Sequence, residues 1–102
     1  MEETLTHVVD ELTRLGYKEH FQVVDGRLRA LRTGQRFEPH DVVIRGYYRF
    51  EGVSDPDDMA IVYAIETKSG TRGVLVDAFG VYSDPEIGAA LQHVPMLGKI
   101  AA

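Results

Sequence analysis

Apolar residues recur at helical spacing near the start of the chain and alternate with polar ones further along. Between residues 5 and 15 they stand three or four positions apart, which predicts an amphipathic helix with one buried face. This stripe consists of Leu5, Val8, Val9, Leu12 and Leu15. A second, short helix is predicted to begin at Ser83-Asp84-Pro85-Glu86, where serine and glutamate have capping-box spacing. Its apolar residues are Ile87, Ala90 and Leu91.

The segment between the predicted helices shows the alternation typical of half-buried strands. Two such strands flank Asp25-Gly26, a favoured hairpin turn because both positions tolerate positive φ. Pro39 has no amide hydrogen, so residues 37–40 are predicted to form a connection. Further strands are predicted at 42–50, 59–65 and 74–76. We therefore expect one α+β domain spanning 1–102, with an N-terminal helix, an antiparallel meander of about five strands and a short C-terminal helix, both helices covering one sheet face.

The predicted strand 42–50 has one mainly apolar face and one polar face. The alternation assigns Val42, Ile44, Tyr48 and Phe50 to the apolar face, and Val43, Arg45, Tyr47 and Arg49 to the other. Gly46 interrupts the apolar series, which indicates a bulge or a site of close packing. Arginine can hold an anion and tyrosine can stack on a ligand, so Arg45, Tyr47 and Arg49 are candidate ligand-binding residues.

The composition excludes several classes of protein. There is no cysteine, so no disulfide, thiolate nucleophile or cysteine-based zinc site can form. The net charge of −5 and the pI of about 5.2 oppose binding to a phosphate backbone, and we expect no nucleic-acid partner. The apolar runs are far shorter than the roughly 20 residues that span a bilayer, and the acidic first residues do not resemble a secretory signal. These features predict a cytoplasmic domain without membrane contact.

Positive and negative charges are unevenly distributed along the chain. Six arginines fall within residues 27–49: Arg27, Arg29, Arg32, Arg36, Arg45 and Arg49. Acidic residues follow directly within 51–58. Such asymmetry either marks an interaction surface or disappears when the two signs meet across neighbouring strands. We favour cancellation in the fold.

The acidic segment 51–58 is a candidate metal site, because Mg²⁺ and Ca²⁺ prefer several oxygen ligands. Its carboxylates are Glu51, Asp55, Asp57 and Asp58. Their spacing does not match the twelve-residue calcium loop. Aspartate, proline, glycine and serine also build turns through local hydrogen bonds and a preset φ. We favour the turn interpretation over the metal site.

Asp77 is the second candidate, because it follows the apolar run Val74-Leu75-Val76. A carboxylate there is costly unless it is paired or hydrogen-bonded. It could act as a general base or metal ligand with a raised pKa. More often such a group pairs with an arginine across the sheet, here Arg45, Arg49 or Arg72. If Asp77 lies beside the acidic segment, the two form one hypothetical Mg²⁺ or Ca²⁺ site.

Two parts of the chain resemble a known family. The first consists of Arg49-Phe50-Glu51-Gly52, Ser54-Asp55-Pro56-Asp57-Asp58 and Ala60-Ile61-Val62-Tyr63-Ala64-Ile65, and the second is Gly73-Val74-Leu75-Val76-Asp77-Ala78-Phe79-Gly80-Val81-Tyr82-Ser83. They are similar to small bacterial proteins that are often named phosphoribosylpyrophosphate synthetase. True synthetases are much longer and have two domains built on parallel sheets. Their ribose-phosphate loop needs a second acidic residue and a Thr-Gly turn, whereas Ala78 and Phe79 follow Asp77 here. The resemblance therefore implies family membership without an established activity, and we expect no synthetase activity.

Two classes of function are consistent with this sequence. We prefer a non-catalytic binding or protein-interaction domain that contacts a protein partner or a second copy through a sheet edge or face, because no acid–base–nucleophile set can be assembled. The alternative is a Mg²⁺- or Mn²⁺-dependent enzyme or a phosphate-binding protein. In that case Glu51, Asp55, Asp57, Asp58 and Asp77 would hold the cation, and Arg45 or Arg49 the anion.

Overall fold

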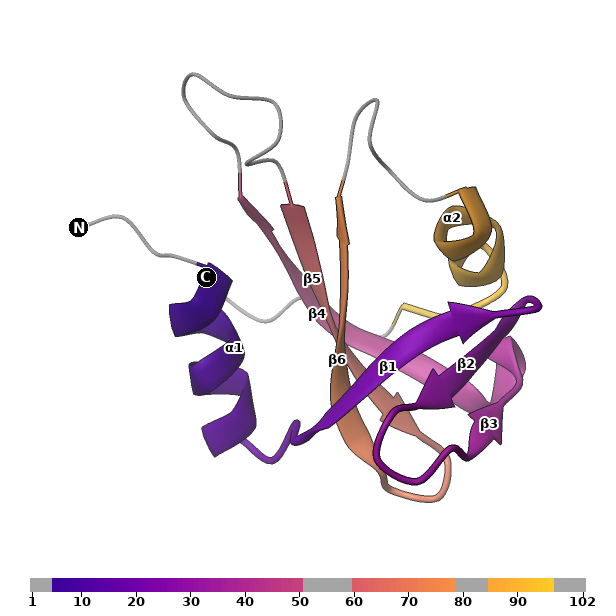
Figure 1. Ribbon diagram of the computed structural model, residues 1–102, viewed down its shortest axis with the longest axis horizontal. Coiled ribbons are helices and arrows are strands. Elements are labelled where there is room, and N and C mark those ends of the chain that lie inside the picture. The colour runs from indigo at the N-terminus through magenta and orange to yellow at the C-terminus, as the bar shows by residue number, and fades with distance from the viewer. Residues whose placement is uncertain (1–4, 51–59, 79–84, 97–102) are drawn as a thin grey trace.

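The computed structural model describes residues 5–50, 60–78 and 85–96. The elements in these ranges are α1 (Leu5–Arg14), β1 (Glu19–Val24), β2 (Arg27–Ala30), β3 (Arg36–Phe37), the 3-10 helix η1 (Pro39–Asp41), β4 (Val42–Phe50), β5 (Ala60–Thr67), β6 (Arg72–Ala78) and α2 (Pro85–Leu91) (Figure 1). The six strands form one sheet with the order β3-β2-β1-β6-β5-β4. The predicted α+β class is confirmed, but a five-stranded antiparallel meander is wrong.

The sheet is mixed because its two halves are joined by a parallel pair. The hairpins β1–β2, β2–β3, β4–β5 and β5–β6 are antiparallel, as adjacent strands in the sequence predict. β1 also pairs with β6 in parallel, through Glu19↔Gly73 and His20↔Val74. The meander breaks at η1, where the chain passes from β3 at one edge to β4 at the other. The alternation of apolar and polar residues does not indicate which strands pair when they lie more than fifty residues apart in the sequence.

The sheet curls so that both of its edges contribute to the same hydrophobic core (Figure 1). Phe37 of β3 and Val42 of β4, from opposite edges, belong to one cluster. The rings of Phe21 and Phe37 meet edge-to-face at 5.9 Å within it, an arrangement that aromatic quadrupoles favour. The other members are Leu28, Ala30, Ile44, Ile65, Leu75, Ile87 and Val94. We call this the inner cluster.

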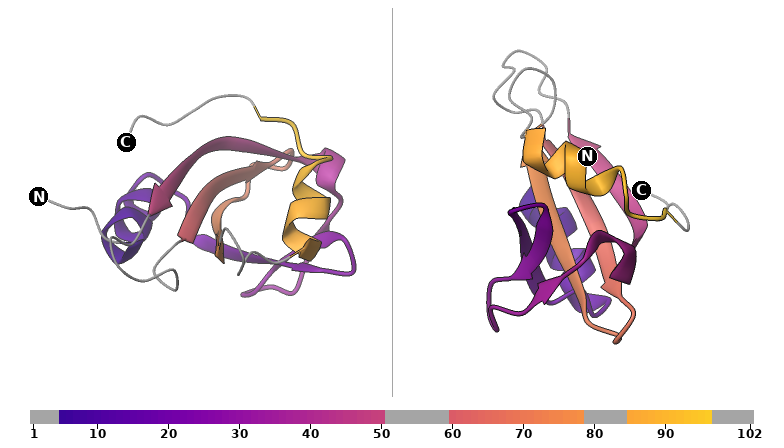
Figure 2. Two further views of the ribbon diagram at one scale, coloured as in Figure 1. Left: turned by 90° about the horizontal axis from the view of Figure 1, so that it is seen from above. Right: turned by 90° about the vertical axis from the view of Figure 1, so that its right-hand side faces the viewer.

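The two helices pack on opposite sides of the sheet. Val8 and Leu12 of α1 form a second cluster with Tyr17, Val62, Ala64 and Val74, which we call the α1 cluster. Ile87 of α2 instead belongs to the inner cluster. Figure 2 shows α1 and α2 separated by the strands. The prediction that both helices cover one face is therefore not met, because β5 and β6 bury side chains on both faces.

Two residues of the apolar runs noted in the sequence are exposed. Leu15 follows Arg14, the last residue of α1, and is 56% exposed. Val76 is 41% exposed, whereas its neighbours Val74 and Leu75 are buried on opposite faces of β6. An apolar run is therefore buried only where another element packs against it.

β1 passes close to β6 at Gly73. A methyl group at this position would overlap the main-chain carbonyl of Glu19, and it would lie 2.6 Å from Cε2 of Phe21. The main chain of β1 and the Phe21 ring both sit in the space that a side chain would fill. The parallel pair therefore requires a residue without Cβ here.

We predict that Gly73→Ala lowers the free energy of unfolding by about 3 kcal/mol, because the overlap forces apart strands that carry the inner cluster. Gly88→Ala in α2 is the matched control, since nothing lies within 4 Å of the added methyl. This change should raise stability by about 0.5–1 kcal/mol through helix propensity. Urea unfolding followed by circular dichroism measures both. Equal stabilities for Gly73→Ala and the wild type would contradict the close crossing.

Candidate functional site

A bulge in β4 decides which of its side chains share a face. The pairing with β5 runs Ile44↔Ile65 and then Gly46↔Ala64, so Arg45 is an extra residue. One extra residue reverses the alternation of everything that follows it. Ile44 consequently packs in the inner cluster and Tyr48 against the α1 cluster. The single apolar face predicted for 42–50 is therefore wrong, although Gly46 correctly indicated the irregularity.

The bulge also separates Arg45 from the two residues with which it was grouped. Arg45 Nε lies 3.4 Å from Glu66 Oε1, and Arg72 Nε lies 3.6 Å from the same oxygen. Arg72 is also positioned over the ring of Tyr17, 5.7 Å from its centroid. Because Tyr17 packs in the α1 cluster, this charged group lies on the α1 side of the sheet. Arg45 does not share a face with Tyr47 and Arg49, and the prediction that placed the three together is wrong.

Tyr47, Arg49, Tyr63 and Asp77 share one face at one end of the sheet, and we call them the sheet-end cluster. Tyr47↔Tyr63 and Tyr63↔Leu75 make one row across β4, β5 and β6. Arg49↔Ile61 and Ile61↔Asp77 make the next row. Leu75 belongs to the inner cluster, so these rows lie on the face that α2 also contacts. The structure thus brings together three predicted site residues that stand up to thirty positions apart.

The side chains of this cluster influence one another electrostatically. The guanidinium of Arg49 lies over the Tyr47 ring, 5.8 Å from its centroid, which is a cation–π geometry. Tyr63 is half-buried and packs against the inner cluster. Burial raises the pKa of the Tyr63 phenol, the Asp77 carboxylate raises it further, and Arg49 lowers it. Tyr63 is therefore held neutral between a carboxylate and a guanidinium.

Tyr63 is the member that the sequence did not indicate as a site residue. Its alternation with Ile61 and Ile65 marks a core position, and its ring does pack against the core. Only the register of β5 with both neighbouring strands places it between Tyr47 and Leu75. The sequence offered one weak signal, namely a tyrosine in an otherwise aliphatic series.

The acidic residues of the predicted metal site, Glu51, Asp55, Asp57 and Asp58, lie outside the described residues. The strand ends on either side of their segment are described: Phe50 pairs with Ala60, and Ala60 with Ala78. This row follows directly after the row that contains Arg49 and Asp77. Within 5–50, 60–78 and 85–96, no group of three histidine, aspartate or glutamate residues could hold a metal ion.

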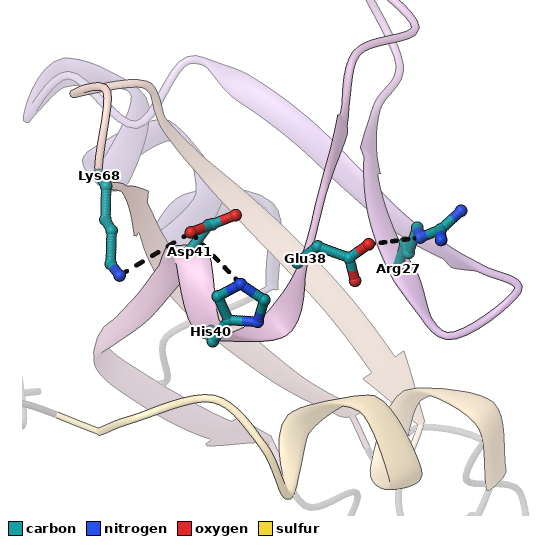
Figure 3. A network of polar contacts seen from close by, with 5 residues as sticks. All are labelled: Arg27, Glu38, His40, Asp41 and Lys68. Atoms are coloured by element: carbon teal, nitrogen blue, oxygen red, sulfur yellow. Dashed lines mark hydrogen bonds and ion pairs between the residues drawn. The ribbon is translucent and has the colours of Figure 1, made fainter.

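A separate polar network lies around η1, at the strand ends away from the sheet-end cluster. Asp41 Oδ1 is 3.8 Å from Lys68 Nζ and 3.7 Å from His40 Nε2 (Figure 3). The Lys68 main-chain N–H also donates to the Asp41 carbonyl at 2.9 Å. These contacts connect η1 to the β5–β6 turn. Exposed ion pairs of this kind contribute little stability individually. Because these contacts join η1 to a neighbouring turn, we regard the network as structural.

Comparisons of the chain with protein-family models, with curated proteins and with solved structures find no match. The resemblance noted in the sequence stays a prediction, and function must be argued from geometry. No helix in the described part of the chain is long and apolar enough to cross a membrane.

The arrangement predicts how the Tyr63 phenol titrates. Its pKa lies above the ordinary value of about 10, so the stability that it contributes is present below pH 10 and is lost as the pH rises through its folded pKa. Asp77→Asn should lower this pKa, because it removes a neighbouring negative charge. Arg49→Gln should raise it further, because it removes the opposing positive charge.

NMR titration of the tyrosine ζ carbons measures these shifts, and Tyr63→Phe assigns the resonance. Arg45→Gln serves as the control, since Arg45 contacts Glu66 and is not among the groups that shift Tyr63. If Asp77→Asn and Arg49→Gln left the Tyr63 pKa unchanged, the four side chains would not form one cluster.

Proposed function

We propose that this chain is a non-catalytic binding domain that contacts its ligand or protein partner through the sheet-end cluster. The observation that carries the proposal is the convergence of Tyr47, Arg49, Tyr63 and Asp77 from three strands onto one face. Rigid strands hold such groups more precisely than loops do. A ligand seated there would meet a cation, a carboxylate and two phenols.

The change in polarity along this face supports the proposal. The row that contains Ile44 and Ile65 is apolar and buried in the inner cluster, and Leu75, which pairs with Tyr63 in the next row, is buried there too. The last rows carry half-buried Tyr47, Tyr63 and Asp77 and exposed Arg49. The polar groups therefore converge directly beside apolar side chains, a combination that is common in binding sites. Tyrosine and arginine are also the side chains most enriched where proteins bind partners.

The chemistry of the cluster favours binding over catalysis. Asp77 and Tyr63 could exchange a proton, but a phenol whose pKa is raised above 10 is a weak acid at neutral pH. The cluster contains no histidine, serine or cysteine that could serve as a base or nucleophile. We therefore assign these groups to recognition: Arg49 for an anionic group, Asp77 for a donor, and Tyr47 for an apolar or planar surface.

The Mg²⁺- or Mn²⁺-dependent alternative stays a prediction. Of its five carboxylates, only Asp77 lies in the described part of the chain. Mn²⁺ tests it directly, because a bound paramagnetic ion broadens nearby amide resonances. Selective broadening at Asp77 and Ala78 would favour the metal-dependent alternative, and uniform weak broadening would contradict it.

A matched pair of variants on β4 tests the binding proposal. Arg49→Gln should weaken ligand binding about tenfold, the effect expected when one charge-assisted hydrogen bond is lost. Arg45→Gln, four residues away on the other face, should leave the affinity unchanged. Both variants should remain folded, since the cation–π contact of Arg49 contributes only about 0.5–1 kcal/mol and an exposed ion pair such as that of Arg45 contributes at most about 1 kcal/mol.

Amide NMR titrations with ribose 5-phosphate and ATP locate a small ligand, and sedimentation equilibrium measures self-association. We expect perturbations centred on Tyr47, Arg49, Tyr63 and Asp77, or a dimer that Arg49→Gln weakens. A monomeric protein whose sheet-end resonances respond to neither probe would count against the proposal. An affinity that Arg45→Gln reduces and Arg49→Gln does not would contradict it.

A further inference from the structure

The outer face of β1, β2 and β3 carries a row of three polar side chains. Gln22 pairs with Arg29 across β1 and β2, and Arg29 pairs with Arg36 across β2 and β3. Their neighbours Leu28, Ala30 and Phe37 point into the inner cluster, so this row points away from it. It lies on different strands, and on the other side of the sheet, from the sheet-end cluster.

The pairing of Arg29 with Arg36 is unfavourable without a counterion. Directly opposed residues on antiparallel strands have Cβ atoms roughly 5 Å apart, and like charges at this distance destabilise the sheet. Other arginines of the same stretch are compensated: Arg27 Nε lies 2.7 Å from Glu38 Oε1, and Arg45 contacts Glu66. Among the described residues, no carboxylate forms an ion pair with Arg29 or Arg36.

Arg29 lies beside a turn whose main chain is fixed by hydrogen bonds. It is half-buried, and its Nη2 lies over Gly34, 3.8 Å from where a Cβ would stand. Main-chain hydrogen bonds fix this turn, from Gly34 N–H to the Ala30 carbonyl at 2.8 Å and from Ala30 N–H to the Gln35 carbonyl at 2.9 Å. Buried Glu19 accepts a further hydrogen bond from the Arg32 N–H at 3.1 Å. The hairpin therefore holds the main chain of Arg29 directly opposite that of Arg36.

We propose that Arg29 and Arg36 bind the phosphate or diphosphate group of a small ligand, with Gln22 as an additional donor. Two guanidiniums can each offer a planar pair of N–H donors to phosphate oxygens. An anion between them also offsets their mutual repulsion, because each guanidinium is attracted to it. A nucleic-acid backbone fits less well, because the domain carries a net charge of −5 and the row supplies only two cations.

The experiment compares Arg29→Gln and Arg36→Gln with Arg14→Gln, which removes the same charge from α1. Amide NMR titrations with inorganic phosphate and pyrophosphate are run against sodium chloride at equal ionic strength. We expect saturable shifts at Gln22, Arg29 and Arg36, with an affinity that each row variant weakens about tenfold or more and that Arg14→Gln does not.

Thermal unfolding supplies an independent measurement, in which the variant that weakens phosphate binding is expected to be the more stable protein when phosphate is absent. At low ionic strength without phosphate, Arg36→Gln should raise the melting temperature, because it removes a like-charge pair. Pyrophosphate should raise the melting temperature of the wild type and have little effect on the variant. A purely solvated pair of arginines would show neither behaviour.

Two results would overturn the proposal. One is a response to phosphate and pyrophosphate no larger than the response to chloride, or one that Arg29→Gln and Arg36→Gln leave intact. The other is binding of a single-stranded oligonucleotide at these residues without any response to pyrophosphate, which would make the row a nucleic-acid contact.

Discussion

The parallel contact between β1 and β6 at Gly73 is the constraint on which the rest of this structure depends. Each half of the sheet is built from local hairpins, which need only turns and alternation to form. The contact of Glu19 and His20 with Gly73 and Val74 joins these halves into one sheet. It also places Phe21 over Gly73 and beside Phe37, so that the curled sheet closes around one core. Without it, β1, β2 and β3 would lose the apolar face of β4, β5 and β6 against which they pack.

The bulge at Arg45 has a comparable role for the polar residues. By reversing the alternation in the middle of β4, it directs Tyr48 toward α1 and leaves Tyr47 and Arg49 on the face of Tyr63 and Asp77. The extra residue, Arg45, joins Arg72 at Glu66. One inserted residue thus divides a row of similar side chains into a structural ion-pair group and a candidate binding site.

The charge asymmetry of the sequence is only partly cancelled in the fold. Arg27 and Arg45 meet carboxylates, as expected for neighbouring strands of opposite charge. Arg29 and Arg36 meet each other instead, because the short β3 pairs with β2 in a register that aligns them. Arg49 lies over the ring of Tyr47, and it acts on Tyr63 together with Asp77. Arginines from one stretch of sequence therefore have three different environments.

The sequence by itself determined most local elements: α1, the Asp25-Gly26 hairpin, the strands β4, β5 and β6, and α2. It missed the two-residue strand β3, because Pro39 led to the prediction that residues 37–40 form a connection, whereas Phe37 pairs with Leu28. The spacing of apolar residues, the residue types in turns and the positions of prolines are properties of a few adjacent residues. The elements that depend on them could therefore be predicted without the fold. The candidate residues Tyr47, Arg49 and Asp77 were also predictable, because their types are unusual beside apolar runs.

Only the tertiary structure decided the parallel β1–β6 pair, the side of the sheet that each helix covers, and which candidates share a face. These depend on register between strands distant in sequence, and a shift of one residue moves a side chain to the opposite face. Arg45 was misplaced for this reason, and Tyr63 was missed because a core tyrosine and a site tyrosine follow the same alternation. The neighbours of a side chain across a sheet are set by backbone pairing, which the composition of a single strand does not encode.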